Sequence, residues 1–230
     1  MSGLIITGLL NTIMSHSFSN QASPTFKSYQ RSSMPKTTDV CLGGYGWKVM
    51  CFAEGLDRSI LNKIYNCLTT YLTWHSKMLM IRLDFSLYDS PSHNQDISKS
   101  LQHIAKIQKK RYGCIVGYGW VREQNSTDDK CHYHCFILLD GHKVQNSKTT
   151  FDLVLQIKNI VIDINPHVPE HCYYMIRRNE LDSFQAALYR LSYLAKNASK
   201  QHQPMSAKWF SFSRIKARPI NKLTDSGTAN

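Results

Sequence analysis

The chain has 230 residues, of which 42% are hydrophobic, so it is long enough to bury the core of one substantial domain. Its 28 Lys and Arg residues outnumber its 16 Asp and Glu residues, and the formal charge of +12 favours an anionic partner, most often nucleic acid, over a merely basic soluble protein. There is no apolar run of about 18 residues, and the apolar start lacks the basic segment of a signal peptide, so we expect no membrane span and no leader.

The N-terminal part of the chain differs in composition from the rest. Residues 15–40 are rich in Ser, Thr, Gln, Asn and Pro, which is typical of a flexible arm or linker. We therefore assign residues 1–45 to a flexible arm and residues 46–216 to one globular domain. The tail at 217–230 carries few apolar residues and is expected to be loose.

Two helices and a strand are predicted next. In residues 57–75 and 95–111 apolar side chains recur at helical spacing, and the second helix points lysines outward. Between them, residues 78–88 alternate in polarity, as in a strand with one buried face. The polar face of this strand holds Arg82 and Asp84. Contact with DNA or a metal ion competes there with a solvated or structural role.

A β-hairpin is expected after the second helix. Residues 112–124 and 131–141 are rich in aromatic and β-branched residues, and the polar connector 125–130 lies between them. Residues 150–160 are then predicted to be helical. These elements indicate an α+β fold with a central, mainly antiparallel sheet and packed helices.

A proline-marked loop and a last helix complete the predicted elements. Residues 163–171 contain "HVPEH", which looks like a metal motif but is better interpreted as a linker. The helix is predicted over 182–197, and Asp182 with Gln185 resembles a capping box at its start. Downstream, "WFSFSRIKAR" mixes aromatic and basic residues. This segment suits either stacking on single-stranded DNA or packing against the domain.

The stretch "CHYHC" starts the second strand of the predicted hairpin. Side chains alternate along a strand, so His132 and His134 share one face, and a Cys/His zinc site that needs both faces is disfavoured. Two imidazoles with one oxygen ligand suit a divalent ion that keeps open positions. Glu123, at the end of the preceding strand, is the candidate third ligand, although its face depends on the register. The alternative is an ordinary polar strand face.

The last predicted helix places two tyrosines and a lysine on one face. Tyr189, Tyr193 and Lys196 follow the spacing i, i+4, i+7, on the side opposite the main apolar stripe. A metal ion that polarises a phosphodiester would let a tyrosine attack it, and a lysine could hold the phosphate or lower the pKa of the tyrosine. Two tyrosines one turn apart would permit two successive transesterifications. The alternative is a helix buried on two sides.

These motifs, in this order, carry a family resemblance. "HYHCFILLDG" resembles the His-hydrophobic-His motif of the rolling-circle replication initiators called HUH endonucleases, and "YRLSYLAK" resembles their two-tyrosine motif. Together with "WVRE" and "WFSFSR", they resemble the inovirus replication-protein-like family, also called the YagK/YfjJ C-terminal domain family. The resemblance spans about residues 56–214, and an aromatic residue, Tyr133, stands where an aliphatic one is more usual.

The resemblance implies a set of roles. His132, His134 and Glu123 would bind Mg²⁺ or Mn²⁺, and Tyr189, Tyr193 and Lys196 would be catalytic. The expected activity is metal-dependent nicking and joining of single-stranded DNA, through a phosphotyrosine, at the replication origin of a phage or prophage. A non-catalytic DNA-binding regulator on the same fold is the alternative.

The resemblance and the composition together also suggest partners and a location. A host helicase or polymerase is a possible protein partner. Seven cysteines without CxxC pairs fit reduced thiols in the cytoplasm of a bacterial host. The residues expected to contact DNA are Arg82, Lys109, Lys110, Arg214 and Lys216.

Overall fold

The structure is a computed structural model, and it describes residues 36–87, 93–124, 131–158, 164–197 and 208–219. The strands are β1 (Thr37–Leu42), β2 (Tyr45–Met50), β3 (Lys77–Leu87), β4 (Gly117–Gln124), β5 (Cys131–Asp140), β6 (Ile164–His167), β7 (Tyr173–Arg177) and β8 (Phe210–Phe212). The helices are α2 (Arg58–Trp74), α3 (Gln95–Tyr112), α4 (Lys148–Lys158) and α5 (Leu181–Ser192), followed by the short 3₁₀ helix η1 (Tyr193–Ala195).

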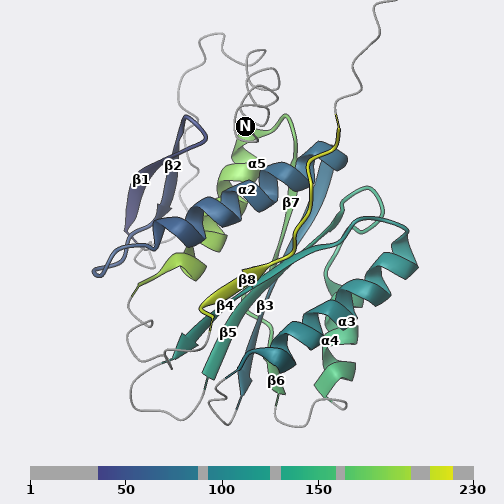
Figure 1. Cartoon of the computed structure of the whole chain (residues 1–230). Coiled ribbons are helices and arrows are strands. Elements are labelled where there is room, and N and C mark those ends of the chain that lie inside the picture. Colours follow the sequence, from purple (N-terminus) through teal and green to yellow (C-terminus); the bar gives the residue numbers. More distant parts are fainter. Residues whose placement is uncertain (1–35, 88–92, 125–130, 159–163, 198–207, 220–230) are drawn as a thin grey trace, which may run out of the picture.

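A six-stranded sheet forms the centre of the domain (Figure 1). Its order is β6-β3-β5-β4-β8. Strand β7 pairs with the same edge of β3 as β6 does, but with the first half of β3, whereas β6 pairs with its last residues. All the strand pairs of the described residues are antiparallel. The predicted α+β class and the predicted hairpin are therefore confirmed, and the hairpin corresponds to β4 and β5. Its connector, 125–130, lies outside the described residues.

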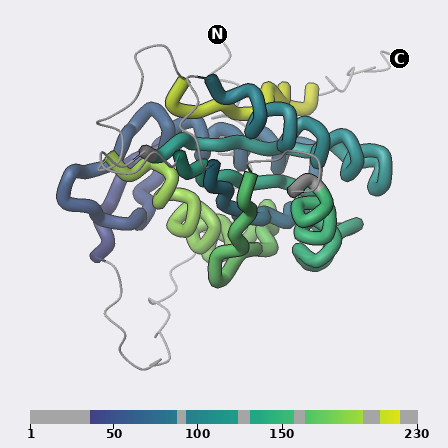
Figure 2. Tube along the Cα trace, turned by 90° about the horizontal axis from the view of Figure 1, so that it is seen from below, coloured from purple at the N-terminus to yellow at the C-terminus, as the bar shows by residue number. Residues whose placement is uncertain are grey.

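Helices cover both faces of this sheet. In Figure 2 α5 and the β1–β2 hairpin lie toward one side of the molecule, and α3 and α4 lie toward the other. The side chains of β3 are therefore buried on both faces, so the expectation of a single buried face is wrong. The alternation itself is confirmed, because the two sets of side chains belong to two separate cores.

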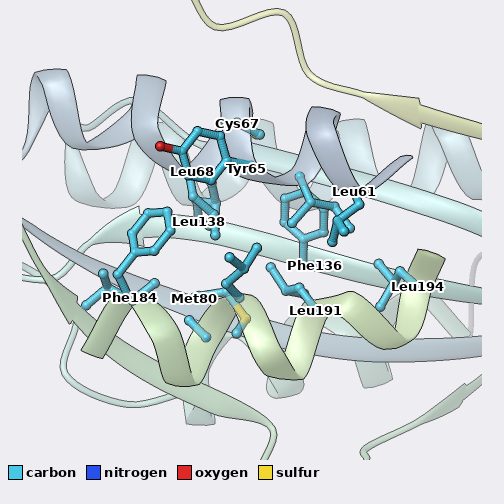
Figure 3. Close-up of a cluster of buried hydrophobic side chains, with 14 of the residues drawn as sticks. Leu61, Tyr65, Cys67, Leu68, Met80, Phe136, Leu138, Phe184, Leu191 and Leu194 are labelled. Carbon is cyan, nitrogen blue, oxygen red and sulfur yellow. The ribbon is translucent and has the colours of Figure 1, made fainter. Parts of the chain in front are cut away.

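The first core lies between the sheet and the pair α2 and α5. Figure 3 shows side chains of α2 and α5 pointing toward one another across Met80, Phe136 and Leu138 of the sheet. Helix α2 begins at Asp57, whose carboxylate accepts hydrogen bonds from the backbone N–H groups of the second and third residues that follow it. A cap of this kind satisfies N–H groups that have no partner within the helix. The helix predicted over 57–75 is thus confirmed.

The second core lies on the opposite face, under α3 and α4. The helices predicted over 95–111 and 150–160 are confirmed as α3 and α4, with ends that differ by one or two residues. The side chain of Tyr133 is fully buried in this core, and its hydroxyl donates a hydrogen bond to Asn94. Thus Tyr133, at the unusual middle position of the histidine motif, faces away from the histidines and serves the core.

The hairpin of β1 and β2 corrects the predicted N-terminal boundary. Residues 37–45 were assigned to the flexible arm, but they form β1 and its turn, and Leu42 is buried. The first residues of β1 are polar and exposed, so a hydrophobicity pattern does not predict this strand. Residues 1–35 of the predicted arm and most of the tail at 217–230 lie outside the described residues.

The β1–β2 hairpin is joined to α5 by Gln185, which the sequence had predicted to be part of a capping box. The amide of Gln185 accepts from the backbone N–H of Lys48 at 3.0 Å and donates to its carbonyl at 2.7 Å. Helix α5 has Glu180 as its N-cap and no side-chain cap hydrogen bond, so the predicted capping box at Asp182 and Gln185 is wrong. The side-chain amide of Gln185 forms hydrogen bonds with the backbone of Lys48 on β2 instead.

The segment predicted as a loop at 163–171 contains a strand in part. Its first described residues, 164–167, form β6 and pair with β3. Pro166 is tolerated because β6 is an edge strand and needs no ladder hydrogen bond on its outer side. His167, at the end of β6, lies directly across from Asp84. Strand β7, which follows, was not predicted.

The C-terminal aromatic segment packs against the domain. Strand β8 pairs with β4, and the ring of Phe212 lies 5.5 Å from that of Phe136. This favours the packing interpretation of these aromatic residues, while the basic residues Arg214 and Lys216 remain exposed. Among the described helices, none has the length and apolar character needed to cross a membrane.

Candidate functional site

The register of β4 and β5 answers the question of which face Glu123 occupies. Glu123 pairs with His132, and Val121 pairs with His134. Directly opposed residues of an antiparallel pair point to the same face. The two histidines and Glu123 therefore share the face that α5 covers, near the ends of their strands.

His134 is held between two carboxylates. Its Nδ1 lies 2.9 Å from Oδ1 of Asp84 on β3, and its Nε2 is in close contact with Oε2 of Glu123 on β4. All three side chains are largely buried. Burial alone would lower the pKa of His134, but its hydrogen bonds with Asp84 and Glu123 outweigh this effect and raise that pKa.

This arrangement suits a positive charge at the ring. A neutral imidazole has one N–H, so one of the two carboxylates would face a lone pair unless the ring is protonated or a cation stands beside it. A carboxylate on the second ring nitrogen, as Asp84 provides, is the usual support of a metal-bound histidine. The donor set His132, His134 and Glu123 thus fits a divalent ion chemically. In the part of the chain that the structure describes, however, no three His, Cys, Asp or Glu side chains converge to hold one.

Asp84 and Arg82, both on β3, lie beside His134 in this site. Two nitrogens of the Arg82 guanidinium each lie 3.4 Å from a carboxylate oxygen of Asp84, and one of them is 3.3 Å from Nδ1 of His134. Burial would raise the pKa of Asp84, yet the neighbouring His134 and Arg82 lower it. Arg82 is only 3% exposed, so a contact with DNA would have to be made within the site and not on the open surface.

The ring of Tyr193 packs against His134 and Arg82. It lies edge-on to the His134 ring, with 5.0 Å between the centroids, and the guanidinium carbon of Arg82 lies 4.6 Å from the Tyr193 ring centroid. Nζ of Lys196 is 3.4 Å from Oε1 of Glu123 and 5.7 Å from the Tyr193 ring centroid. We call His134, Asp84, Glu123, Tyr193 and Lys196 the His134 cluster. Tyr193, Glu123 and His134 also line a small hollow.

The backbone at Tyr193 is not the continuous helix that was predicted over 182–197. Helix α5 ends at Ser192, Tyr193 begins the 3₁₀ turn, and the backbone of Lys196 is extended. The segment at residues 55–57, just before α2, forms backbone contacts with the chain that follows η1. The N–H of Asp57 donates to the carbonyl of Ala195 at 2.7 Å, and Leu56 forms a β-bridge with Lys196. The predicted helical spacing of Tyr193 and Lys196 is therefore wrong, although both side chains reach the site.

Tyr189 does not join the His134 cluster. Burial raises its pKa, with a smaller contribution from Tyr174 of β7, and its backbone carbonyl accepts from the hydroxyl of Ser192. No contact of its side chain with His134 or Lys196 is present among the described residues. Of the two predicted nucleophiles, the structure brings only Tyr193 to His134.

The lysines predicted to contact DNA lie away from the cluster. Lys109 and Lys110 are exposed on α3, which covers the opposite face of the sheet. Beside α3 is a mainly apolar hollow lined by Gln102, Ala105, Lys106, Lys109, Ile115, Val116 and Tyr118. These lysines therefore cannot touch a phosphate at the His134 cluster itself.

The sequence left the role of Asp84 open between contact with DNA or a metal ion and a solvated or structural role. Its place beside Arg82 on a polar strand face was the usable signal. Arg190, three residues before Tyr193, was not singled out at all. Its Nη2 donates to the carbonyl of Glu170 at 2.8 Å, a contact that only the folded chain reveals.

The fold and the site together define an α+β domain whose antiparallel sheet carries a histidine and two carboxylates, next to a tyrosine and a lysine that follow the last helix. Compared with known families, residues 45–210 match the YagK/YfjJ C-terminal domain, and the chain belongs to this family. The match runs from the first residue of β2 to the first residue of β8. No curated protein and no solved structure matches the chain.

Proposed function

We propose that the protein is a metal-dependent endonuclease and transesterase of the HUH type, which nicks and rejoins single-stranded DNA to start rolling-circle replication of a phage or related element. One observation carries this proposal: the Tyr193 ring packs on His134, whose two ring nitrogens meet Asp84 and Glu123. The charge of the chain, +12, supports DNA as the partner. A cytoplasmic location and contact with a host helicase or polymerase belong to the same proposal.

In the proposed reaction, Tyr193 is the first nucleophile. Its hydroxyl oxygen forms a bond to phosphorus, the bond from phosphorus to the 3′ oxygen breaks, and the proton passes finally to that 3′ oxygen. The free 3′ hydroxyl can then prime a polymerase, while the 5′ side stays on the tyrosine. His132, His134 and Glu123 would hold Mg²⁺ or Mn²⁺, which would polarise the phosphate and stabilise its developing charge. Asp84 fixes the orientation of the His134 ring, and Lys196 lies close enough to the tyrosine ring to offset charge on the phosphate.

A non-catalytic DNA-binding regulator remains the second candidate function. It is favoured by one observation, which is that no group of three His, Cys, Asp or Glu side chains in the described residues is arranged to hold a metal ion. On this proposal the basic surfaces would bind DNA, and the His134 cluster would be a structural ion-pair network.

Covalent trapping distinguishes these two functions. The full chain is incubated with a random single-stranded DNA library and Mn²⁺, and covalent adducts are isolated on denaturing gels, with the modified residue located by peptide mass. We expect an adduct on Tyr193. Tyr193→Phe should lower the rate at least about a thousandfold, whereas the matched change Tyr189→Phe should leave the first cut intact. An undiminished adduct in the Tyr189→Phe/Tyr193→Phe double variant would refute the tyrosine chemistry. DNA binding without any adduct would favour the regulator.

A further inference from the structure

Arg82 is an unusual guanidinium because it is buried and incompletely bonded. It lies in the middle of β3, 3% exposed, and two of its three nitrogens, Nε and Nη2, donate to Asp84. The third, Nη1, is buried and has no hydrogen-bond partner among the described residues. An unsatisfied buried donor destabilises the fold, and more so when it is charged. The nitrogen belongs to the group that packs on the Tyr193 ring.

A second arginine with the same defect lies close by. Arg190 points from α5 toward the segment between β6 and β7, where the Glu170 carbonyl accepts from its Nη2. Its Nε is buried and, within the described ranges, has no partner. Burial lowers the pKa of Arg190, and the positive charge of Arg82 lowers it further. The segment between β6 and β7 also contacts β3, since the N–H of Arg82 donates to the carbonyl of Cys172 at 2.6 Å.

Positive charge is in excess around Tyr193. Among the described residues, the ionisable side chains near its ring include Arg82, Arg190, Lys196, Asp84, Glu123 and His134. Arg82 is paired with Asp84, and Lys196 with Glu123. Among the described residues no carboxylate forms an ion pair with Arg190. Two like charges in a largely buried place, each with an unused N–H, are stabilised best by an anion with several acceptor oxygens.

We propose that Arg82 and Arg190 form a phosphate-binding pair that holds the phosphoryl group on which Tyr193 acts. This inference rests on the proposed function for the identity of the ligand, a DNA phosphodiester and then the phosphotyrosine. The anion site itself rests on the two arginines alone. Fixed N–H donors directed at the phosphate oxygens stabilise the charge that develops there during attack. The pair complements Lys196, which approaches the site beside Glu123.

Inorganic phosphate is the probe that tests the site without any nucleic acid or chemistry. Its binding to the full chain, treated with EDTA, is measured by the shift in thermal unfolding and by ³¹P NMR line broadening. We expect phosphate to bind wild type and Tyr193→Phe, and to bind Arg190→Gln at least about tenfold more weakly. The matched control is Arg177→Gln, which removes the same charge from an exposed arginine paired with Glu180 on the surface. This control should bind phosphate as wild type does.

A second measurement links the pair to catalysis. Arg190→Gln should lower the rate of the Tyr193 adduct at least about tenfold while weakening DNA binding no more than Arg177→Gln does. Arg82→Lys keeps the charge but loses the planar fork, and should lower the same rate if it folds; Arg190→Gln decides the question if it does not. Equal phosphate affinity in the two glutamine variants would overturn the anion site even if the adduct forms. Arg190-dependent phosphate binding without any adduct would retain the anion site and reject the nuclease.

Discussion

Asp84 is expected to hold the cluster together, and replacing it with asparagine tests this. Asp84→Asn keeps the shape of the side chain and one acceptor oxygen but removes the charge. Arg82 then lacks its carboxylate partner, and His134 loses the charged acceptor at its Nδ1. The change therefore removes charge from a buried network and creates no cavity.

The size of the effect follows from burial. The side chain of Asp84 is 17% exposed and that of Arg82 is 4% exposed. Removing one partner of a buried ion pair costs about 3–5 kcal/mol, and the remaining exposure and the amide oxygen reduce this cost, so we expect a loss of about 2–3 kcal/mol. The matched control is Asp39→Asn, whose partner is Lys48 and whose side chain is 73% exposed. An exposed pair of this kind contributes about 0–1 kcal/mol.

Urea unfolding at neutral pH, with EDTA present, measures both free energies of unfolding by linear extrapolation. The midpoint should move with little change in slope, because the folded state remains compact. If Asp84→Asn loses no more stability than Asp39→Asn, then the buried pair does not stabilise the fold. The argument from burial would then be wrong for this site.

Two further predictions concern the packing and the pH dependence of the fold. A Cβ atom added at Gly119 would lie 2.7 Å from the Phe136 ring, so Gly119→Ala should cost about 1–3 kcal/mol in urea unfolding, and an unchanged midpoint would refute the tight packing. Burial lowers the pKa of His75, even though Asp140 beside it acts in the opposite direction. Because the folded chain then binds this proton less readily than the unfolded chain, the stabilisation is complete above about pH 6.5 and is lost as the pH falls. Calorimetry of His75→Gln should show a pH dependence flatter than that of wild type by up to about 1.4 kcal/mol per pH unit, and parallel curves would contradict this.

The sequence predicted those parts of the fold in which local pattern and burial agree. The alternation along β3 and the helical spacing of α2 and α3 each follow from one face packing on a core, so both were readable. The short strands β6 and β7 were not, since each is stabilised mainly by pairing with β3, a partner distant in the chain. The same holds for β1, whose polar residues pair only with β2.

The candidate site was predictable in its residue types and less so in its geometry. Alternation placed His132 and His134 on one face, but only the β4–β5 register could place Glu123 beside them. The end of α5 depends on backbone hydrogen bonds from residues 55–57, which no pattern within 182–197 reveals. For that reason both tyrosines were placed on one helix face with Lys196, whereas the structure brings only Tyr193 to His134.

One face of the central sheet explains why the site forms where it does. Along β3 this face is apolar at Met80 and becomes polar at Arg82 and Asp84, and along β5 it is apolar at Phe136 and becomes polar at His134. The register pairs Arg82 with Phe136 and Asp84 with His134, so the change on β3 comes one residue pair before the change on β5. Helix α5 covers the apolar part and ends where the polar part begins. The turn η1 therefore places Tyr193 against charged groups and not against core side chains. A buried polar patch under the end of a helix costs stability in a purely structural domain. Its position beside Tyr193 would follow from the chemistry proposed for that hydroxyl.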